Sequence, residues 1–493
     1  MRIACALLGG VLVQGAACSA GVEASAPSAG LSGGAPAANA GASGLGVTGG
    51  AASTGLGGST AGRGGALGAV GGTSVESGGA SAVSGGRSAA IGGVLNSAGG
   101  VLASSGGVSS GGSATAGAPA PTGGRAAITG GSGGMGDSGA GSSAKASEGP
   151  AETTPQGYGQ GTTGGGNKAS QKASTLAQMQ ALIDEYAGSG GLVIEYTGSF
   201  DFKSISDACV QHTLEPQVLE IKRKNDITVI GADGSAANFG IHIASTASNI
   251  IVRNMTIGLT PGADGSDIVS IEGMSDGFPS KIWIDHNEFF TSMIECDGAG
   301  DTEFDGMVDL KKGADEVTVS YNYFHDHHKV SLNGASDSDT DVRRITFHHN
   351  LFENVGARVP LQRGGLSHLL NNYFLDVLVS GINVRMNGNS LIEGNYFENV
   401  KNPVTSRDSD EIGFWDLRNN NLAGPTDVAA GNPFGITWDD GNDGTVNATD
   451  WKTSEVFPAQ LGYDYAAQSF ECVRAGLRAV VGAGKGLKTL TCD

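Results

Sequence analysis

The first 157 residues of the sequence include no aromatic residue and few charges. Between residues 21 and 155 there is no Phe, Trp or Tyr, and Gly, Ala, Ser and Thr make up almost the whole stretch. Such a segment cannot bury enough apolar surface to offset the entropy that it would lose on ordering. We therefore predict a Gly/Ala/Ser-rich disordered linker over 21–155 and a folded domain over 156–493.

The sequence also lacks a hydrophobic run of the roughly 20 residues that a membrane-spanning helix needs. At the N-terminus, Met1-Arg2 is followed by a short apolar run, Ile3 to Val13, and then by small residues. This order is typical of an export signal, which we predict over 1–20. Ala16-Ala17-Cys18 resembles a bacterial lipoprotein signal, although Gly15 stands where Leu is usual. We expect a protein that is secreted, or tethered to the outer cell surface through a lipidated Cys18.

Positive charge is scarce, and the formal net charge is −20. This excludes a nucleic-acid binder whose affinity comes from counterion release. A negatively charged polymer would also be repelled, so a substrate of that kind would need a local metal ion, Arg or Lys to compensate.

Cysteine is scarce too. Beyond the two cysteines of the signal region, four remain in the predicted domain, and none forms a Cys-x-x-Cys motif, so cysteine metal sites are not expected. Four cysteines in an exported domain predict two disulfides, for which three pairings are possible. The four are Cys209, Cys296, Cys472 and Cys492.

One helix is predicted at the start of the domain. Thr175-Leu-Ala-Gln178 matches a capping box, and apolar residues recur at helical spacing up to Tyr186. After Gly191 the pattern changes to short β-rich runs, which include Leu192–Tyr196, 218–221 and 227–230.

A repeat then follows, in which the motif Asn-x-Phe returns at intervals of 35, 28, 22 and 23 residues. Periods of this length indicate a repeat architecture, and no helical periodicity fills the gaps. A propeller would need a more regular period near 40. We therefore predict an all-β fold, a right-handed single-stranded parallel β-helix in which the Asn residues bond between coils and the Phe residues stack inside, with a short N-terminal capping helix and an irregular C-terminal tail. The motif begins at Asn287, Asn322, Asn350, Asn372 and Asn395.

The most chemically suggestive stretch runs from Asp305 to Arg363. Asp305 and Asp309 are four residues apart, which on one strand would place both carboxylates on the same face, where they would suit Ca²⁺. Lys329, Arg358 and Arg363 follow, and Pro360 indicates a bend between the two arginines. A cation site beside fixed positive charges predicts a substrate that carries carboxylates.

From about Tyr158 to the C-terminus the sequence resembles the pectate lyases of the pectate/pectin lyase superfamily, polysaccharide lyase family 1. Six motifs in the expected order carry the resemblance: Ile282-Trp-Ile-Asp-His286, Asp305-Gly-Met-Val-Asp-Leu-Lys311, Val319-Ser-Tyr-Asn-Tyr323, Lys329-Val, Ala357-Arg-Val-Pro-Leu-Gln-Arg-Gly364 and Asn402-Pro-Val-Thr-Ser-Arg407. The resemblance implies a parallel β-helix, Ca²⁺ dependence and eliminative cleavage of α-1,4-linked polygalacturonate. We expect polygalacturonate to be the partner and the chain to act as a monomer.

Residue by residue, the resemblance implies that Asp267, Asp305 and Asp309 bind Ca²⁺, that Arg358 abstracts the proton, and that Lys329 and Arg363 bind substrate carboxylates. It also implies the disulfides Cys209–Cys296 and Cys472–Cys492. Where some relatives carry a further acid this chain has Gly265, and Asp301 is a candidate ligand for an additional ion.

Several alternatives stay open from the residues. Lys329 is the rival base, because a guanidinium normally stays protonated. Pectin lyase activity on methylated polymer, hydrolysis by paired carboxylates and a non-catalytic pectin-binding surface protein are the alternative functions. We interpret Trp283, Asp285 and His286 as structural, and expect strand alternation to direct His286 away from the other two.

Overall fold

The computed structural model describes residues 145–211, 213–262, 266–296, 304–422, 432–438, 453–454, 457 and 461–493. These residues lie in one compact unit, Ala126–Asp493. The predicted export signal, Cys18 and most of the predicted linker lie outside the described residues, as does Asp301. Among the described helices, none is long and apolar enough to cross a membrane.

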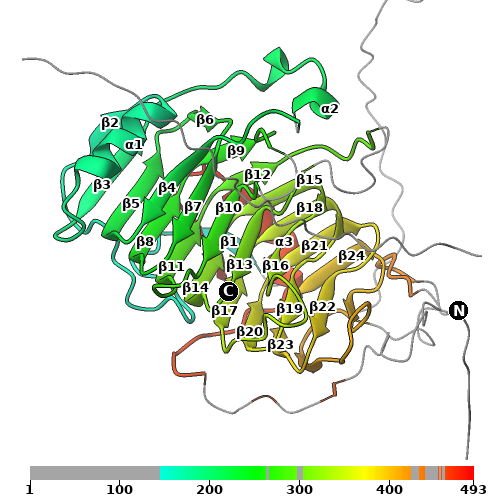
Figure 1. The fold of residues 1–493 in the computed structure, drawn as a ribbon. Helices are drawn as coiled ribbons and strands as arrows, with labels where there is room; N and C mark the ends of the chain where they lie inside the picture. Colours follow the sequence, from blue (N-terminus) through cyan, green and yellow to red (C-terminus); the bar gives the residue numbers. More distant parts are fainter. Residues whose placement is uncertain are drawn as a thin grey trace, which may run out of the picture. The chain divides into compact units, whose positions relative to one another are not determined.

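The chain winds in successive coils, and each complete coil adds one strand to each of three parallel sheets (Figure 1). The eight-stranded sheet consists of β4 (Val218–Lys222), β7 (Gly240–Ala244), β10 (Val269–Glu272), β13 (Val308–Lys311), β16 (Leu332–Asn333), β19 (Leu361–Arg363), β22 (Ile382–Arg385) and β25 (Val404–Thr405).

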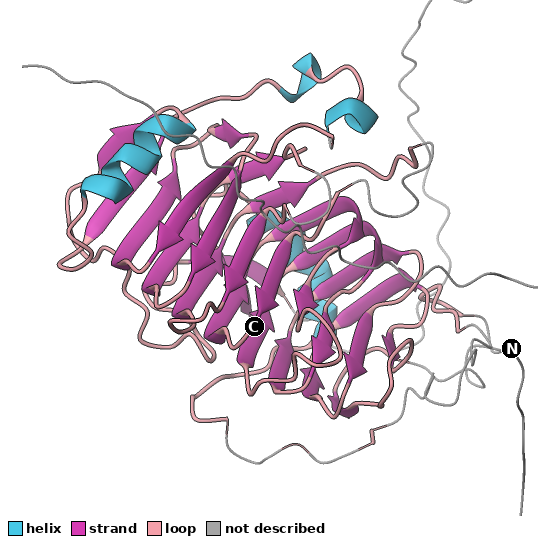
Figure 2. Ribbon diagram, in the orientation of Figure 1, coloured by secondary structure: helices cyan, strands magenta, loops and turns pink. Residues whose placement is uncertain are grey.

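The ten-stranded sheet consists of β2 (Gln171–Ala173), β3 (Leu192–Tyr196), β5 (Asn225–Gly231), β8 (Ser248–Arg253), β11 (Ser280–Asp285), β14 (Asp315–Ser320), β17 (Arg344–His348), β20 (Leu366–Leu370), β23 (Asn389–Glu393) and β26 (Phe414–Arg418). The seven-stranded sheet consists of β6 (Ala236–Ala237), β9 (Thr256–Gly258), β12 (Glu288–Phe290), β15 (Tyr323–Lys329), β18 (Leu351–Ala357), β21 (Tyr373–Val377) and β24 (Tyr396–Val400). Figure 2 shows the strands stacked in layers, and the predicted all-β parallel β-helix is confirmed.

The Asn-x-Phe repeat stabilises the stack in two ways. Each repeat Asn bonds to the next, as when Asn322 Nδ2 donates to Asn350 Oδ1 at 3.0 Å. Phe289, Phe324 and Phe352 are buried and stack in the interior, with ring centroids 5.4 and 4.9 Å apart. Burying one such ring contributes about 1.5–3 kcal/mol. The repeat is therefore both the polar ladder and part of the apolar core, as predicted.

The predicted N-terminal helix is α1 (Leu176–Glu185), which lies beside β2 and β3 at one end of the stack (Figure 1). Thr175 caps it by accepting a bond from Gln178 N at 3.2 Å. Gln178 Oε1 accepts from Ser174 N at 2.8 Å, one residue earlier than a capping box requires. Two further short elements are the 3-10 helix Phe202–Ser204 and α2 (Ala208–Gln211).

The predicted boundary between the linker and the folded domain is wrong. β1 (Ala146–Gly149) lies inside the range predicted as linker, where it pairs antiparallel with β27 (Thr489–Cys492). Its sequence, Ala-Ser-Glu-Gly, has no apolar alternation, and it is held by its partner strand and by packing of Ala146 against the cluster around α3. The C-terminal region is also less irregular than predicted, because β26 continues the ten-stranded sheet and α3 (Phe470–Val480) buries an apolar face against Tyr321, Leu351 and Tyr396.

Candidate active site

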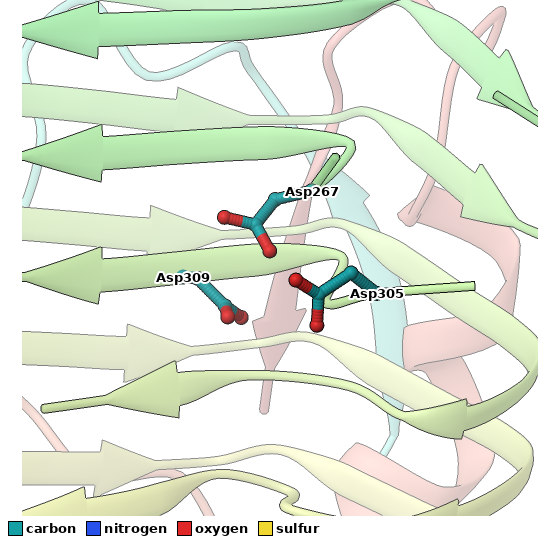
Figure 3. Close-up of side chains that lie close together, drawn as sticks. All are labelled: Asp267, Asp305 and Asp309. Atoms are coloured by element: carbon teal, nitrogen blue, oxygen red, sulfur yellow. The ribbon is translucent and has the colours of Figure 1, made fainter. Parts of the chain in front are cut away.

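Three carboxylates converge where two neighbouring coils enter the eight-stranded sheet (Figure 3). One oxygen from each of Asp267, Asp305 and Asp309 lies within 4.8 Å of the others. Asp267 lies two residues before the start of β10, and Asp309 is the second residue of the adjacent strand β13. Asp267 and Asp309 are buried, whereas Asp305 is half-buried. The sequence-predicted trio is therefore assembled by stacking two coils.

The predicted reason for the convergence of Asp305 and Asp309 is wrong. β13 begins only at Val308, so the two aspartates do not share a strand. Instead, the chain turns between Asp305 and Met307 and carries the Asp305 side chain back toward Asp309, as Figure 3 shows. Gly306 allows this close packing, because a Cβ at that position would lie 2.0 Å from Asp309 Oδ1.

Backbone and lysine contacts hold the carboxylates in place. Asp267 Oδ1 accepts from Gly306 N at 3.2 Å, and Asp309 Oδ1 accepts from Leu332 N at 2.9 Å. Lys311 Nζ lies 2.8 Å from Asp267 Oδ2 and 3.4 Å from Asp309 Oδ2. Lys311 was not among the predicted site residues, although it stands two positions after Asp309 and therefore on the same face of β13.

Burial dominates the electrostatics of the trio. It raises the pKa of Asp267, although Lys311 opposes the shift, and it raises the pKa of Asp309 well above its usual value, with the charge of Asp267 adding to the effect. Burial alone would lower the pKa of Lys311. The negative charges of Asp309 and Asp267 have the larger effect and raise the pKa of the lysine. A divalent cation would relieve the repulsion among these carboxylates.

The predicted cations lie on the next two coils at the same corner. Met307 N donates to Val330 O at 2.8 Å, and Ser331 N donates to Arg358 O at 2.8 Å. Lys329 ends β15 and is almost fully buried, and Arg358 follows β18 with φ +57°, before a cis Val359–Pro360 bond. Stacked coils are about 4.8 Å apart, so the backbone of Lys329 lies one coil from that of Asp309, and the backbone of Arg358 lies two coils from it.

Arg363 is held in a fixed orientation on β19. Its Nε donates to Asp337 Oδ1 at 2.7 Å, and its Nη1 donates to Gly334 O at 2.8 Å. On the next strand, Arg385 is its direct partner. Burial, and then the charge of Arg363, lower the pKa of Arg385 to about 10.

Arg385 was also missed from the sequence. It follows Arg363 by 22 residues, and Arg407 follows it by another 22, which is one of the intervals of the Asn-x-Phe repeat. Extending that interval from Arg363 would have found it. The three arginines extend the positive charge along the C-terminal coils of the eight-stranded sheet.

The segment Trp283–His286 is buried, which agrees with the interpretation of these residues as structural. Trp283 Nε1 donates to Ser320 Oγ at 2.8 Å, and Ser320 Oγ donates to Asp285 Oδ1 at 2.7 Å. The expected direction of His286 is wrong, because its Nδ1 lies 2.9 Å from Asp285 Oδ2. A φ of +51° at His286 breaks the strand alternation on which the expectation depended.

Both disulfides implied by the resemblance are present, Cys209–Cys296 and Cys472–Cys492. The first joins α2 to the segment after β12, and the second joins α3 to β27. The second disulfide therefore fixes the helix that covers the ends of the seven-stranded sheet to the strand that pairs with β1.

Comparison with known proteins gives one consistent family. The sequence model described as pectate lyase matches residues 140–486. Pectate lyase 3 of Pectobacterium atrosepticum is 43% identical over 354 residues, which is 68% of this chain and 92% of the relative. Pectate lyase C of Dickeya chrysanthemi is 42% identical over 362 residues, or 69% of this chain and 93% of the relative.

Solved structures agree. Pectate lyase II from Xanthomonas campestris is 54% identical with a TM-score of 0.63, and the match covers 68% of this chain and 99% of that chain. Pectate lyase C from Erwinia chrysanthemi, solved with Ca²⁺, is 41% identical with a TM-score of 0.63, covering 69% of this chain and 99% of that chain. A mutant of pectate lyase C was solved in complex with pentagalacturonic acid.

Proposed function

Because this chain belongs to the pectate lyase family and is therefore an enzyme that degrades pectate by lyase action, we propose that it cleaves α-1,4-linked polygalacturonate by Ca²⁺-dependent β-elimination and releases unsaturated oligogalacturonates. The observation that carries this proposal is the corner at which three carboxylates meet, with Lys329 on the next coil and Arg358 on the coil after it. Carboxylates suit a hard cation, and the positive side chains suit an acidic polymer.

The residues present fit Ca²⁺. Asp267, Asp305 and Asp309 offer only oxygen donors, which Ca²⁺ prefers. Asp309 Oδ2 is buried and makes no hydrogen bond within the described part of the chain, so it has capacity for a cation. When bound, Ca²⁺ would neutralise the carboxylate of the reacting sugar and so make its C5 proton easier to remove.

The remaining chemistry belongs to side chains of this chain. Lys329 and Arg363 bind carboxylates of the polymer and fix the sugar relative to the carboxylate trio. Arg358, in its neutral form, takes the proton from C5 as the C4–O bond breaks and a C4–C5 double bond forms. The leaving C4 oxygen acquires a proton from solvent.

A guanidinium normally stays protonated, and positive charge around a guanidine base favours its neutral form. Arg363 on the same coil as Arg358 and Arg385 on the next coil supply such charge. Lys329 is the rival base, and substitution of each residue separately distinguishes the two.

We also propose that the protein acts outside the cell, secreted or held at the outer surface through Cys18. The two disulfides support an oxidising compartment, because such bonds seldom persist in the cytosol. Radiolabelled fatty-acid incorporation into the whole protein, compared with the Cys18→Ala variant, separates the tethered form from the released one.

The test of activity uses de-esterified polygalacturonate, with Ca²⁺ or with a chelator, and follows the ultraviolet absorbance of the unsaturated product. Absorbance that grows only with Ca²⁺ is expected. New reducing ends without absorbance would instead show hydrolysis. Activity confined to fully methylated polymer would show pectin lyase action, and binding without cleavage of any polymer would show a pectin-binding protein.

A further inference from the structure

A pocket of about 210 Å³ lies on the N-terminal side of the carboxylate trio. It opens on the outer face of β4, β7 and β10, and its polar lining consists of Glu220, His242, Ser266, Asp267, Ser270 and Glu272. Asp267 thus borders both the pocket and the candidate metal centre. Pockets for drug-sized ligands have roughly 300–1,000 Å³, so this one suits a single sugar residue.

The pocket is in register with the active site. Glu220, His242, Ser270 and Asp309 are consecutive partners across β4, β7, β10 and β13. Each step between strands is about 4.8 Å. A polysaccharide that lies along the eight-stranded sheet and reaches the carboxylate trio therefore passes over this pocket.

The charge of the side chains on the outer face of the eight-stranded sheet changes sign at the trio. On the C-terminal side the outer row carries Arg363 and Arg385. On the N-terminal side the corresponding partner of Lys311 is an acid, Glu272. Within the pocket, His242 lies between two carboxylates, with Nδ1 3.0 Å from Glu220 Oε1 and Nε2 3.8 Å from Glu272 Oε2.

A free carboxylate in this pocket would face Glu220 and Glu272, and Lys312 Nζ, 2.6 Å from Glu272 Oε1, offsets only part of their negative charge. A sugar carboxylate and the glutamate carboxylates of one pocket repel each other even where the site is partly exposed. The lining is nevertheless suited to an uncharged sugar. Glu220, Ser266 and Ser270 can bond hydroxyl groups, and the buried His242 Nε2 makes no hydrogen bond within the described residues. Pro216 and Val218 add apolar surface.

We propose that this pocket takes a methyl-esterified galacturonate residue, so that the enzyme favours partly esterified polymer with an ester at one fixed position from the cleaved bond. Lys329 and Arg363 then bind the carboxylates of the ester-free sugars, and the acidic pocket binds the uncharged sugar. This inference rests on the proposed function, because it assigns the substrate class of one part of the same groove.

The test compares polygalacturonate with randomly, partly methyl-esterified polygalacturonate, using the whole protein with Ca²⁺. Products are sequenced by tandem mass spectrometry, in which the unsaturated end marks one side of each cut and the new reducing end marks the other. Methyl esters are expected to be enriched at one position counted from the cut. A random distribution of esters around the cut, together with activity on polygalacturonate, would overturn this inference and leave the proposed function standing.

Variants connect the enrichment to the pocket. Glu220→Gln with Glu272→Gln should lower the preference for the ester roughly tenfold, because two like charges near the sugar are removed, and Glu220→Lys should reverse it. Both side chains are partly exposed, at 48% and 24%, so folding should persist and is checked by circular dichroism. The matched control is Glu195→Gln on β3, outside the pocket.

Unchanged enrichment in both pocket variants would overturn the assignment. Absence of product from both polymers would overturn the proposed function and this inference together.

Discussion

Lys311 Nζ lies 2.8 Å from Asp267 Oδ2 and joins two successive coils at the candidate metal centre. The same ammonium lies 3.4 Å from Asp309 Oδ2. Lys311 therefore compensates the charge of two buried acids, a role that a bound cation would share. This relationship makes stability and metal binding interdependent at one position.

We expect Lys311→Ala to lower the free energy of unfolding by about 3 kcal/mol in chelator, since removing one partner of a largely buried ion pair leaves charge uncompensated. Ca²⁺ should restore more stability to the variant than it adds to the unmodified protein. Urea unfolding with and without Ca²⁺ measures both effects. An equal loss in the two conditions would contradict the shared role. Lys172→Ala, which removes a solvent-exposed ion pair with Glu195, is the control.

Arg358→Lys should lower kcat by about 10²–10⁴ if Arg358 is the general base, with little change in affinity for trigalacturonate. Lys329→Ala should mainly raise KM, because it removes a carboxylate contact. Initial rates and calorimetric binding measure the two quantities separately. Arg344→Lys is a matched control, since Arg344 pairs with Asp315 away from the site. Full turnover by Arg358→Ala would refute its assignment as the base.

Asn350→Ala should destabilise the fold by about 3–5 kcal/mol, because it breaks several buried hydrogen bonds at once. Asn350 Nδ2 donates to Val319 O and to Asn372 Oδ1, and its Oδ1 accepts from Asn322. Asn420→Ala, at the more exposed end of the same ladder, should cost clearly less. The urea midpoints of the two variants decide the point, and equal losses would argue against a buried ladder.

Acid should unfold the protein through its buried histidines. Burial lowers the pKa of His349 from 6.5 to about 4, and that of His368 from 6.5 to about 3. Below pH 6.5 the unfolded chain binds protons at these histidines that the folded chain does not bind. The stability that the two neutral histidines contribute is therefore complete above pH 6.5 and is lost as pH falls toward 4 and then 3. Each should add at most about 1.4 kcal/mol per pH unit to the slope of stability.

Urea unfolding from pH 7.5 down to pH 4.5 measures this slope. His368→Gln should make it shallower, because one of the buried proton acceptors is gone. The partner of His368 is the Tyr463 hydroxyl at 2.7 Å, to which Gln can also bond. A slope that does not change in the variant would show that His368 does not titrate differently in the two states.

Glu152 should lower the stability of the fold at alkaline pH. Burial, and then the charge of Asp285, raise its pKa from 4.5 to about 8 against the opposing effect of Arg253. A raised pKa gives stability that is complete below pH 4.5 and is lost as pH rises through 8. Glu152→Gln should therefore unfold at a higher urea concentration than the unmodified protein above pH 8. No difference there would mean that the fold does not raise the pKa of Glu152.

The Asn-x-Phe repeat and the acidic and basic candidate site residues could be predicted, because both are properties of the local sequence. The interval between Asn322 and Asn350 indicated coils, and the coils have the predicted ladder and Phe stack. β1 could not be predicted, because Ala146–Gly149 is a strand only through its pairing with Thr489–Cys492 at the other end of the chain. α3 was missed although Ser469 and Glu471 were available as helix-start signals.

The sequence by itself determined the period of the coils, the acids and the bases, since these depend on which residues recur and how often. Only the tertiary structure decided that Asp305 meets Asp309 through a turn rather than along a strand, that Lys311 bridges two coils, and that an acidic pocket borders Asp267. The physical reason is that strand stacking brings residues some 20–40 positions apart to within about 5 Å, and their pairing depends on where each strand begins.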